Sequence, residues 1–280
     1  MQVLVNGVRL FVDVEGAKFV PDGPAMRERP TLVLLHGGPG ADHSMFKPAF
    51  SALSEVAQLV YVDLRGNGRS QAGPRAGWTL AQWGDDVRGL CEALGIEKPI
   101  VLGLSFGGFV AQAYATRHPR HPGKLILSST AASFPADAAM EALLKLQKQA
   151  AREIGAGGWA CPVAGIAVQV DRPGIAGSRQ RRADPDVAAR YVQRPAVADL
   201  FYGGEAARFD FTADLRRVRC PTLVLAGDHD ETLPLPLAEA MAGALRPELV
   251  RLAVFHRCGH GVHADAPART MQVIRDFILA

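Results

Sequence analysis

With 280 residues, of which 48% are hydrophobic and 21% charged, the chain has enough apolar side chains to bury one large core. The formal net charge is only +3 and both signs are spread through the sequence, so neither nucleic acid nor an anionic membrane is expected as a partner. The longest apolar runs fall far short of the roughly 20 residues that cross a bilayer, so no membrane span is expected.

The first 16 residues alternate apolar and polar side chains, which predicts strands and not a secretory signal. A cytoplasmic location is therefore expected. The four cysteines are far apart and form no C-x-x-C pair, so reduced thiols are expected and no zinc site is indicated. They are Cys91, Cys161, Cys220 and Cys258.

Short apolar runs, many rich in Val, Ile and Leu, recur along the chain and predict strands. They cover residues 3–5, 8–14, 31–35, 59–62, 100–103, 124–128, 222–226 and 249–255. Several are apolar on both faces, as in the central strands of a parallel sheet covered by helices. Helical patterns lie between them, at 79–94, 106–117 and 267–279. This alternation predicts an α/β fold with a doubly wound, mostly parallel sheet.

The alternation of strand and helix breaks between about residues 134 and 211. One helix is predicted at 137–154, and a second begins at Asp184-Pro185 and ends before Pro195, since Asp is a good cap and Pro suits the first helical turn. We therefore expect a core domain formed by 1–133 and 212–280. Residues 134–211 are expected to form a helical lid, or cap, over the carboxyl ends of the strands.

The candidate nucleophile is Ser105, which lies in a G-x-S-x-G pattern with Gly103 and Gly107, where a predicted strand meets a predicted helix. A serine on such a sharp turn exposes its hydroxyl, and neighbouring side chains would collide with the adjacent strand or helix. The alternative is a glycine-rich crossover turn without chemistry. The strand before the pattern and the small-residue helix after it favour the catalytic interpretation.

A serine hydroxyl is a poor nucleophile, so it needs a base within hydrogen-bond reach and an acid that orients the base. Loops after two later predicted strands offer both. For the acid, Asp230 is favoured over Asp228, which directly follows a glycine and suits a capping role. For the base, His260 lies between two glycines and is favoured over His263, while His256 belongs to the end of a strand.

The order Ser105, Asp230, His260, together with HGGPG at residues 36–40, resembles the α/β-hydrolase superfamily. The HGGPG segment and the DLRGNGRS loop at 63–70 are most similar to the proline iminopeptidase branch. The resemblance implies an oxyanion hole for which the backbone NH groups of Gly38 and Phe106 are the candidates. It also implies that His36 braces the loop and that Asp63 and Arg65 hold neighbouring loops together.

These residues predict a serine hydrolase that cleaves carboxylic esters of small to medium acyl groups. The alternative is an aminopeptidase that releases amino-terminal residues from short peptides, in which lid carboxylates would bind the substrate ammonium; the candidates are Glu141, Glu153, Glu205 and Asp210. Carbon–carbon bond hydrolysis, perhydrolysis and a slow-turnover ligand receptor also remain open. No metal or organic cofactor is expected, because no phosphate-loop or dinucleotide fingerprint is present. The sequence leaves the oligomeric state undetermined.

Overall fold

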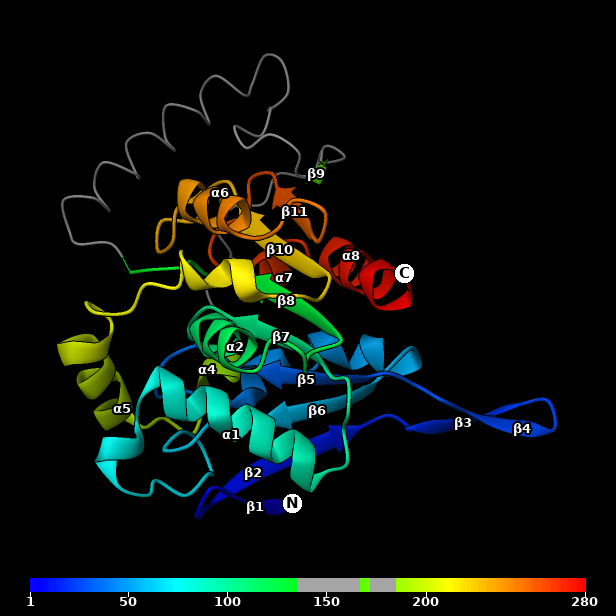
Figure 1. Cartoon of the computed structure of the whole chain (residues 1–280), viewed down its shortest axis with the longest axis horizontal. Coiled ribbons are helices and arrows are strands. Elements are labelled where there is room, and N and C mark those ends of the chain that lie inside the picture. Colours follow the sequence, from blue (N-terminus) through cyan, green and yellow to red (C-terminus); the bar gives the residue numbers. More distant parts are fainter. Residues whose placement is uncertain (135–166, 172–184) are drawn as a thin grey trace.

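The computed structural model of the protein describes residues 1–134, 167–171 and 185–280. In these ranges the larger of two sheets has nine strands in the order β1-β2-β6-β5-β7-β8-β10-β11-β9 (Figure 1). β1 and β2 pair antiparallel, as do β2 and β6, and every other neighbouring pair is parallel. The predicted mostly parallel α/β sheet is confirmed.

All eight predicted strands are present, with ends within a residue or two of those expected. Their bounds are β1 Gln2–Val5, β2 Val8–Glu15, β5 Thr31–Leu35, β6 Gln58–Val62, β7 Ile100–Leu104, β8 Lys124–Ser128, β10 Thr222–Gly227 and β11 Val250–Phe255. Three strands were not anticipated: β3 Phe19–Asp22, β4 Ala25–Glu28 and β9 Ala167–Asp171. β9 pairs with β11 at the sheet edge, inside the segment for which only helices were predicted.

The three helices expected in the core are α1 Leu80–Ala93, α2 Phe106–Arg117 and α8 Pro267–Leu279. The others are α4 Pro185–Arg190, α5 Pro195–Leu200, α6 Leu235–Ala244 and α7 Val262–Asp265. Short helical turns are η1 His43–Phe46, η2 Ala49–Glu55, η3 Arg75–Gly77, η5 Phe201–Glu205 and η6 Asp214–Arg217. The helix predicted at 137–154 lies outside the described residues. No helix in the described ranges combines the length and apolar character needed to cross a bilayer.

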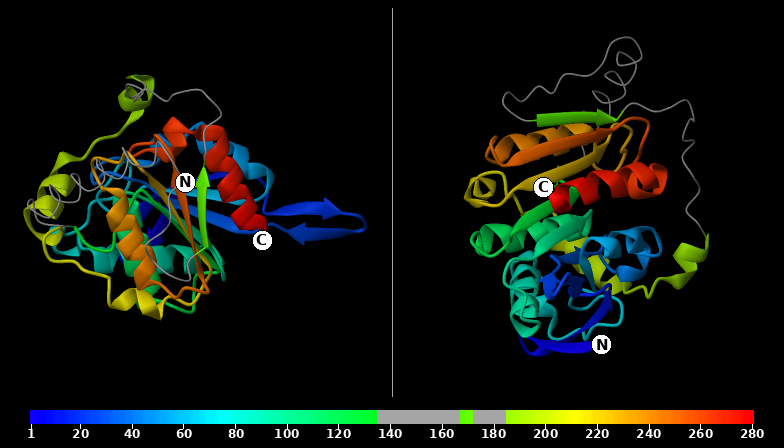
Figure 2. Two further views of the ribbon diagram at one scale, coloured as in Figure 1. Left: turned by 90° about the horizontal axis from the view of Figure 1, so that it is seen from above. Right: turned by 90° about the vertical axis from the view of Figure 1, so that its right-hand side faces the viewer.

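Helices cover both faces of the large sheet (Figure 2). α1, α2 and α6 pack on one face, against a cluster that includes Val33, Val60 and Val101. α8 and η2 pack on the other, against a second cluster that includes Leu32 and Leu102. Because side chains alternate between the faces of a strand, successive residues of each central strand supply the two cores. The helices thus hold the central strands, and leave the carboxyl ends of those strands to carry loops.

The β3–β4 hairpin projects away from the body of the molecule (Figure 1). All four residues of β4 are exposed, and the side chain of Phe19 in β3 is half exposed. Cys91, Cys220 and Cys258 are buried, as expected, whereas Cys161 lies outside the described residues.

Candidate active site

Ser105 occupies the sharp turn between β7 and α2, with φ 53° and ψ −115°. A side chain is excluded on both sides of it. A Cβ atom at Gly103 would lie 2.3 Å from the Gly107 carbonyl oxygen, and one at Gly107 would lie 2.1 Å from the Leu35 carbonyl oxygen. The two glycines therefore allow β7, α2 and the neighbouring strand β5 to approach closely while the turn presents the serine.

Two other loops bring an imidazole and a carboxylate to this serine. His260, on the loop after β11, places Nε2 2.9 Å from Ser105 Oγ. Its Nδ1 lies 2.8 Å from Oδ2 of Asp230, on the loop after β10. Parallel strands direct their carboxyl ends to the same edge of the sheet, which is why residues 105, 230 and 260 meet there.

The surroundings of Asp230 fix which nitrogen of His260 carries a proton. The carboxylate is buried, and its Oδ1 accepts backbone NH bonds from Thr232 and Leu233 at 2.8 and 2.9 Å. Since an ionised carboxylate only accepts hydrogen bonds, His260 Nδ1 donates to Asp230. The lone pair of neutral His260 is then on Nε2, facing the Ser105 hydroxyl.

The alternative acid and base candidates lie elsewhere. Asp228 turns to two other histidines and accepts from Nδ1 of His229 at 2.6 Å and of His256 at 2.5 Å. The ring of His263 packs against Phe50, with centroids 5.5 Å apart. Burial lowers the pKa of His263 to about 4. Of the candidates weighed from the sequence, the structure thus brings Asp230 and His260 to Ser105.

The HGGPG segment follows β5 and lies beside the serine turn. The Gly37 NH is engaged, since it lies 3.0 Å from Met45 Sδ. Gly38 has φ 120°, a left-handed backbone conformation that favours glycine. Within the described part of the chain, neither the Gly38 NH nor the Phe106 NH donates to a protein acceptor. These two amides are therefore available to a substrate oxygen.

His36 links the glycine loop to the loop after β6. Its Nδ1 donates to the Gly37 carbonyl at 2.7 Å, and its Nε2 accepts from the Leu64 NH at 3.1 Å. The ring is fully buried, and burial lowers its pKa below the usual histidine value. A neutral ring suits this arrangement, because Nε2 must keep its lone pair to accept from Leu64.

Hydrogen bonds tie the DLRGNGRS loop to helix α1 and to the HGGPG segment. Arg65 donates two hydrogen bonds to the buried carboxylate of Asp86, both at 2.7 Å. Asn67 Oδ1 accepts from the Gly40 NH at 2.7 Å, and its Nδ2 donates to the Arg65 carbonyl at 2.9 Å. Asn67, which the sequence analysis did not single out, thus joins this loop to the HGGPG segment.

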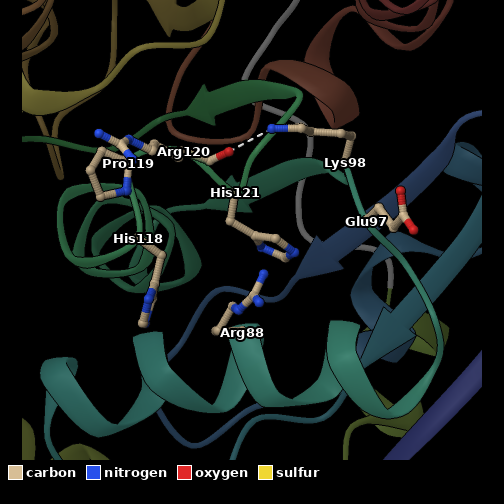
Figure 3. Close-up of a pocket in the computed structure, with 7 residues that line it drawn as sticks. All are labelled: Arg88, Glu97, Lys98, His118, Pro119, Arg120 and His121. Carbon is tan, nitrogen blue, oxygen red and sulfur yellow. Dashed lines mark hydrogen bonds between the residues drawn. The ribbon is translucent and has the colours of Figure 1, made fainter.

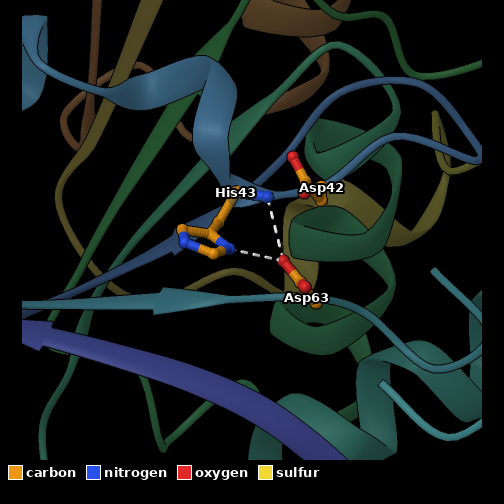
Figure 4. A group of neighbouring side chains, drawn as sticks. All are labelled: Asp42, His43 and Asp63. Atoms are coloured by element: carbon orange, nitrogen blue, oxygen red, sulfur yellow. Dashed lines mark hydrogen bonds and ion pairs between the residues drawn. The ribbon is translucent and has the colours of Figure 1, made fainter. Parts of the chain in front are cut away.

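The sequence analysis did not single out Asp42 or His43, which come shortly after the glycine loop and lie beside Asp63, the residue that follows β6 (Figure 4). One oxygen atom of Asp63 accepts from both the backbone NH and Nδ1 of His43, at 2.9 and 2.6 Å. Burial by itself would raise the pKa of Asp63, but the bonds from His43 and from the Arg69 NH lower it. The only sequence signal was the resemblance that singled out Asp63.

The carboxylate and imidazole atoms of Asp42, His43 and Asp63 lie within 4.8 Å of one another, as metal ligands do. Protein donors already occupy them. Asp42 accepts from the Ser44 NH at 3.1 Å, from Arg69 Nη1 at 2.5 Å and from the Val192 NH at 3.1 Å. With His43 and the Arg69 NH on Asp63, the cluster is explained as a junction between loops.

A hollow of about 500 Å³ lies at the opposite end of the sheet (Figure 3). Its lining comes from the segments that precede β7 and β8, whereas Ser105 follows β7. Two of its lining side chains bond to neighbouring protein groups: Lys98 Nζ donates to the Arg120 carbonyl at 2.6 Å, and His121 Nδ1 lies 2.5 Å from the Tyr114 hydroxyl. This hollow therefore has no part in the serine site.

The chain is similar to hydrolases over nearly its whole length. A family model for the alpha/beta hydrolase fold matches residues 30–158. Proline iminopeptidase PfmaB of Pestalotiopsis fici is 27% identical, with 96% of this chain and 98% of that protein covered. 2-Hydroxymuconate semialdehyde hydrolase of Pseudomonas putida is 26% identical, with 99% and 93% covered. A thermophilic esterase from Thermogutta terrifontis superposes with a TM-score of 0.71 at 27% identity, over 99% and 97% of the two chains.

Proposed function

We propose that this chain, a hydrolase that has the α/β-hydrolase fold and resembles the proline iminopeptidases, is a serine hydrolase with Ser105 as its nucleophile. His260 is the general base and acid, and Asp230 orients it. The Gly38 and Phe106 NH groups form the oxyanion hole. The observation that carries the proposal is the 2.9 Å separation of His260 Nε2 and Ser105 Oγ, with His260 Nδ1 held by Asp230.

In the first half of the reaction, Ser105 Oγ attacks the carbonyl carbon of the substrate while His260 Nε2 takes the hydroxyl proton. The carbonyl oxygen becomes an anion and receives hydrogen bonds from the Gly38 and Phe106 NH groups. Such donors are worth about 3 to 4 kcal/mol each in other serine hydrolases. The intermediate then collapses, the bond to the leaving group breaks, and His260 returns the proton to the departing alcohol or amine.

In the second half, water replaces the leaving group. His260 Nε2 takes a proton from the water as its oxygen attacks the acyl carbon, and the same oxyanion donors stabilise the second tetrahedral intermediate. Collapse releases the carboxylic acid, and the proton on His260 passes to Ser105 Oγ. The enzyme is regenerated, and no cofactor enters the balance of atoms.

We propose carboxylic esters of small to medium acyl groups as substrates. Two of the four carboxylates considered for binding a peptide ammonium are engaged elsewhere. Glu205 Oε1 accepts from the Leu80 NH at the start of α1, at 2.8 Å. Asp210 is exposed, and its Oδ1 accepts from the Thr212 NH at 2.8 Å. Both contacts weaken the case for an aminopeptidase.

The aminopeptidase remains the second candidate because of the HGGPG segment and the similarity to a proline iminopeptidase. It would depend on Glu141 and Glu153, which lie outside the described residues. Similarity to a 2-hydroxymuconate semialdehyde hydrolase keeps carbon–carbon bond hydrolysis among the activities to assay.

We also propose that residues 134–211 form the cap of the active site, with 1–133 and 212–280 as the core domain. Contacts at the end of this segment support it. The Arg194 NH donates to the Gly40 carbonyl at 2.7 Å, and Arg194 Nε donates to the Gly68 carbonyl at 3.1 Å. The segment before α5 therefore touches both glycine loops beside the proposed oxyanion hole.

Labelling with a fluorophosphonate, followed by peptide mapping, tests the nucleophile before any substrate is known. The label is expected on Ser105 and absent from the Ser105→Ala protein; labelling elsewhere, or none, would refute the proposal.

Substrate class is tested separately, by comparing the hydrolysis of p-nitrophenyl acetate and butyrate with that of proline p-nitroanilide. Ester turnover well above that of the anilide is expected, and the reverse would establish the aminopeptidase.

A further inference from the structure

The two loops that carry Asp230 and His260 are joined by a second aspartate–histidine pair. Asp228 comes two residues before Asp230, and His256 four residues before His260. Asp228 Oδ2 accepts from His256 Nδ1 at 2.5 Å, so this pair spans the same gap as the bond between Asp230 and His260. It has no place in the mechanism described above.

Asp228 is 3% exposed, so its carboxylate depends on protein donors. Two imidazoles supply them, because His229 Nδ1 also donates to it, at 2.6 Å. The two histidines differ in one respect. His229 directly follows Asp228 and lies on the same loop as Asp230, whereas His256 belongs to the loop of His260. Of these two bonds to Asp228, the one from His256 therefore ties the loop after β11 to the loop after β10, alongside the bond between His260 and Asp230.

Backbone contacts place the same two loops against each other. The His229 NH donates to the Cys258 carbonyl at 2.9 Å. A Cβ atom at Gly227 would lie 2.2 Å from the Cys258 carbonyl oxygen and 2.4 Å from that of Gly259. The close approach leaves little room for the loops to slide. Asp228 and His256 are the first residues after β10 and β11, so their bond joins the two loops where they leave the sheet.

We infer that Asp228 and His256 are positioning residues that hold the imidazole of His260 within reach of Ser105. The inference rests on the proposed serine hydrolase function. A shift of about 1 Å in a reacting group can cost on the order of a hundredfold in rate, so a loosened loop would act mainly on kcat.

The test compares His256→Leu with His229→Leu, because each variant removes one hydrogen-bond donor from the same carboxylate. His256→Leu is expected to lower kcat for p-nitrophenyl butyrate by about 10- to 100-fold, with KM within about twofold. His229→Leu is expected to stay within about threefold of wild type. The rate of fluorophosphonate labelling of Ser105 should fall in parallel with kcat. Equal kcat in the two leucine variants would overturn the inference.

A rescue experiment separates positioning from general loss of structure. The amide nitrogen of Asn occupies nearly the position of His Nδ1, whereas that of Gln lies one bond farther out. His256→Asn is therefore expected to recover most of kcat and His256→Gln to recover little. This pair also replaces His256→Leu should that variant fail to fold, and equal activity of Asn and Gln would refute the inference. Failure of the wild-type protein to label at Ser105 would instead refute the proposed function.

Discussion

Asp63 and Asp230 are both buried, and each accepts a hydrogen bond from Nδ1 of a histidine. Asp63 lies on the loop after β6 and His43 on the loop after the neighbouring strand β5, and their bond is 2.6 Å long. Asp230 lies on the loop after β10 and His260 on the loop after the neighbouring strand β11, and their bond is 2.8 Å long. Both carboxylates are at most 2% exposed.

The pairs differ in what the second imidazole nitrogen meets. His260 is 32% exposed, and its Nε2 faces the hydroxyl of Ser105. His43 is 8% exposed, its ring stacks on Phe11, and its Nε2 lies 3.9 Å from a carboxylate oxygen of Asp13. A buried aspartate–histidine pair therefore does not by itself indicate catalysis. The group at Nε2 and the access to it distinguish a proposed catalytic pair from a junction between loops.

Removing the serine should have the largest effect on activity, because its hydroxyl is the group that distinguishes the His260 pair from the His43 pair. Ser105→Ala is expected to lower kcat for an activated ester by at least about 10⁴-fold. The unfolding free energy should change by less than about 1 kcal/mol, since the side chain lies at a partly exposed turn. Steady-state assays and thermal unfolding measure both.

A matched control is Ser129→Ala. Ser129 also has a positive φ, of 49°, but it belongs neither to the proposed triad nor to the proposed oxyanion hole. Its variant should keep wild-type kcat. Turnover by Ser105→Ala above a few per cent of wild type would contradict the assignment of the nucleophile.

Replacing the two aspartates should separate the pairs next. Asp230→Asn can donate to His260 Nδ1, which favours the wrong tautomer, and kcat is expected to fall by about 10⁴-fold. Asp63→Asn affects only the loop junction, so activity per folded molecule should fall by far less. Its unfolding free energy should drop by about 2 kcal/mol, because donors from His43 and Arg69 lose a charged acceptor. Active-site titration with the fluorophosphonate gives the folded fraction, and similar kcat losses in both variants would contradict the distinction.

The strands and the serine turn were predictable because each leaves a local pattern. β5 and β8 have the predicted bounds, because each strand is a run of apolar residues that are mostly buried. α6 was missed because its residues, LPLAEAMAGA, are apolar all round and form no stripe. The β3–β4 hairpin was missed because its residues are exposed and so need no alternating apolar pattern.

The residues of the proposed site could be singled out to the extent that they lie in loops with a local sequence pattern. Ser105 has glycines at fixed spacing, and His260 lies between two glycines. The pairing of His43 with Asp63, and of His256 with Asp228, joins residues 20 and 28 positions apart and leaves no local pattern. Such pairs depend on which strands are neighbours and on how their loops approach, and a single sequence does not encode either in a readable way.

The histidines should differ in stability as well as in activity. His43→Leu leaves the buried carboxylate of Asp63 without its side-chain donor, and breaking a buried pair of this kind costs about 3 kcal/mol. His260→Leu removes a partly exposed ring, and Asp230 keeps its two backbone donors, so a loss of about 1 kcal/mol is expected. Urea unfolding measures both values. A larger loss for His260→Leu than for His43→Leu would reverse the roles assigned to the two pairs.

Stability should also depend on pH through His263, a largely buried histidine without a carboxylate at hydrogen-bond distance in the described residues. Burial lowers its pKa to about 4, against about 6.5 in an unfolded chain. Between these values the unfolded state binds more protons, so stability falls as the pH falls from 6.5 to 4, by up to about 1.4 kcal/mol per pH unit. His263→Leu should flatten that part of the stability curve by this slope, with any difference at pH 8 reporting packing alone. Parallel curves for the two proteins in urea unfolding would show that His263 is not buried in its neutral form.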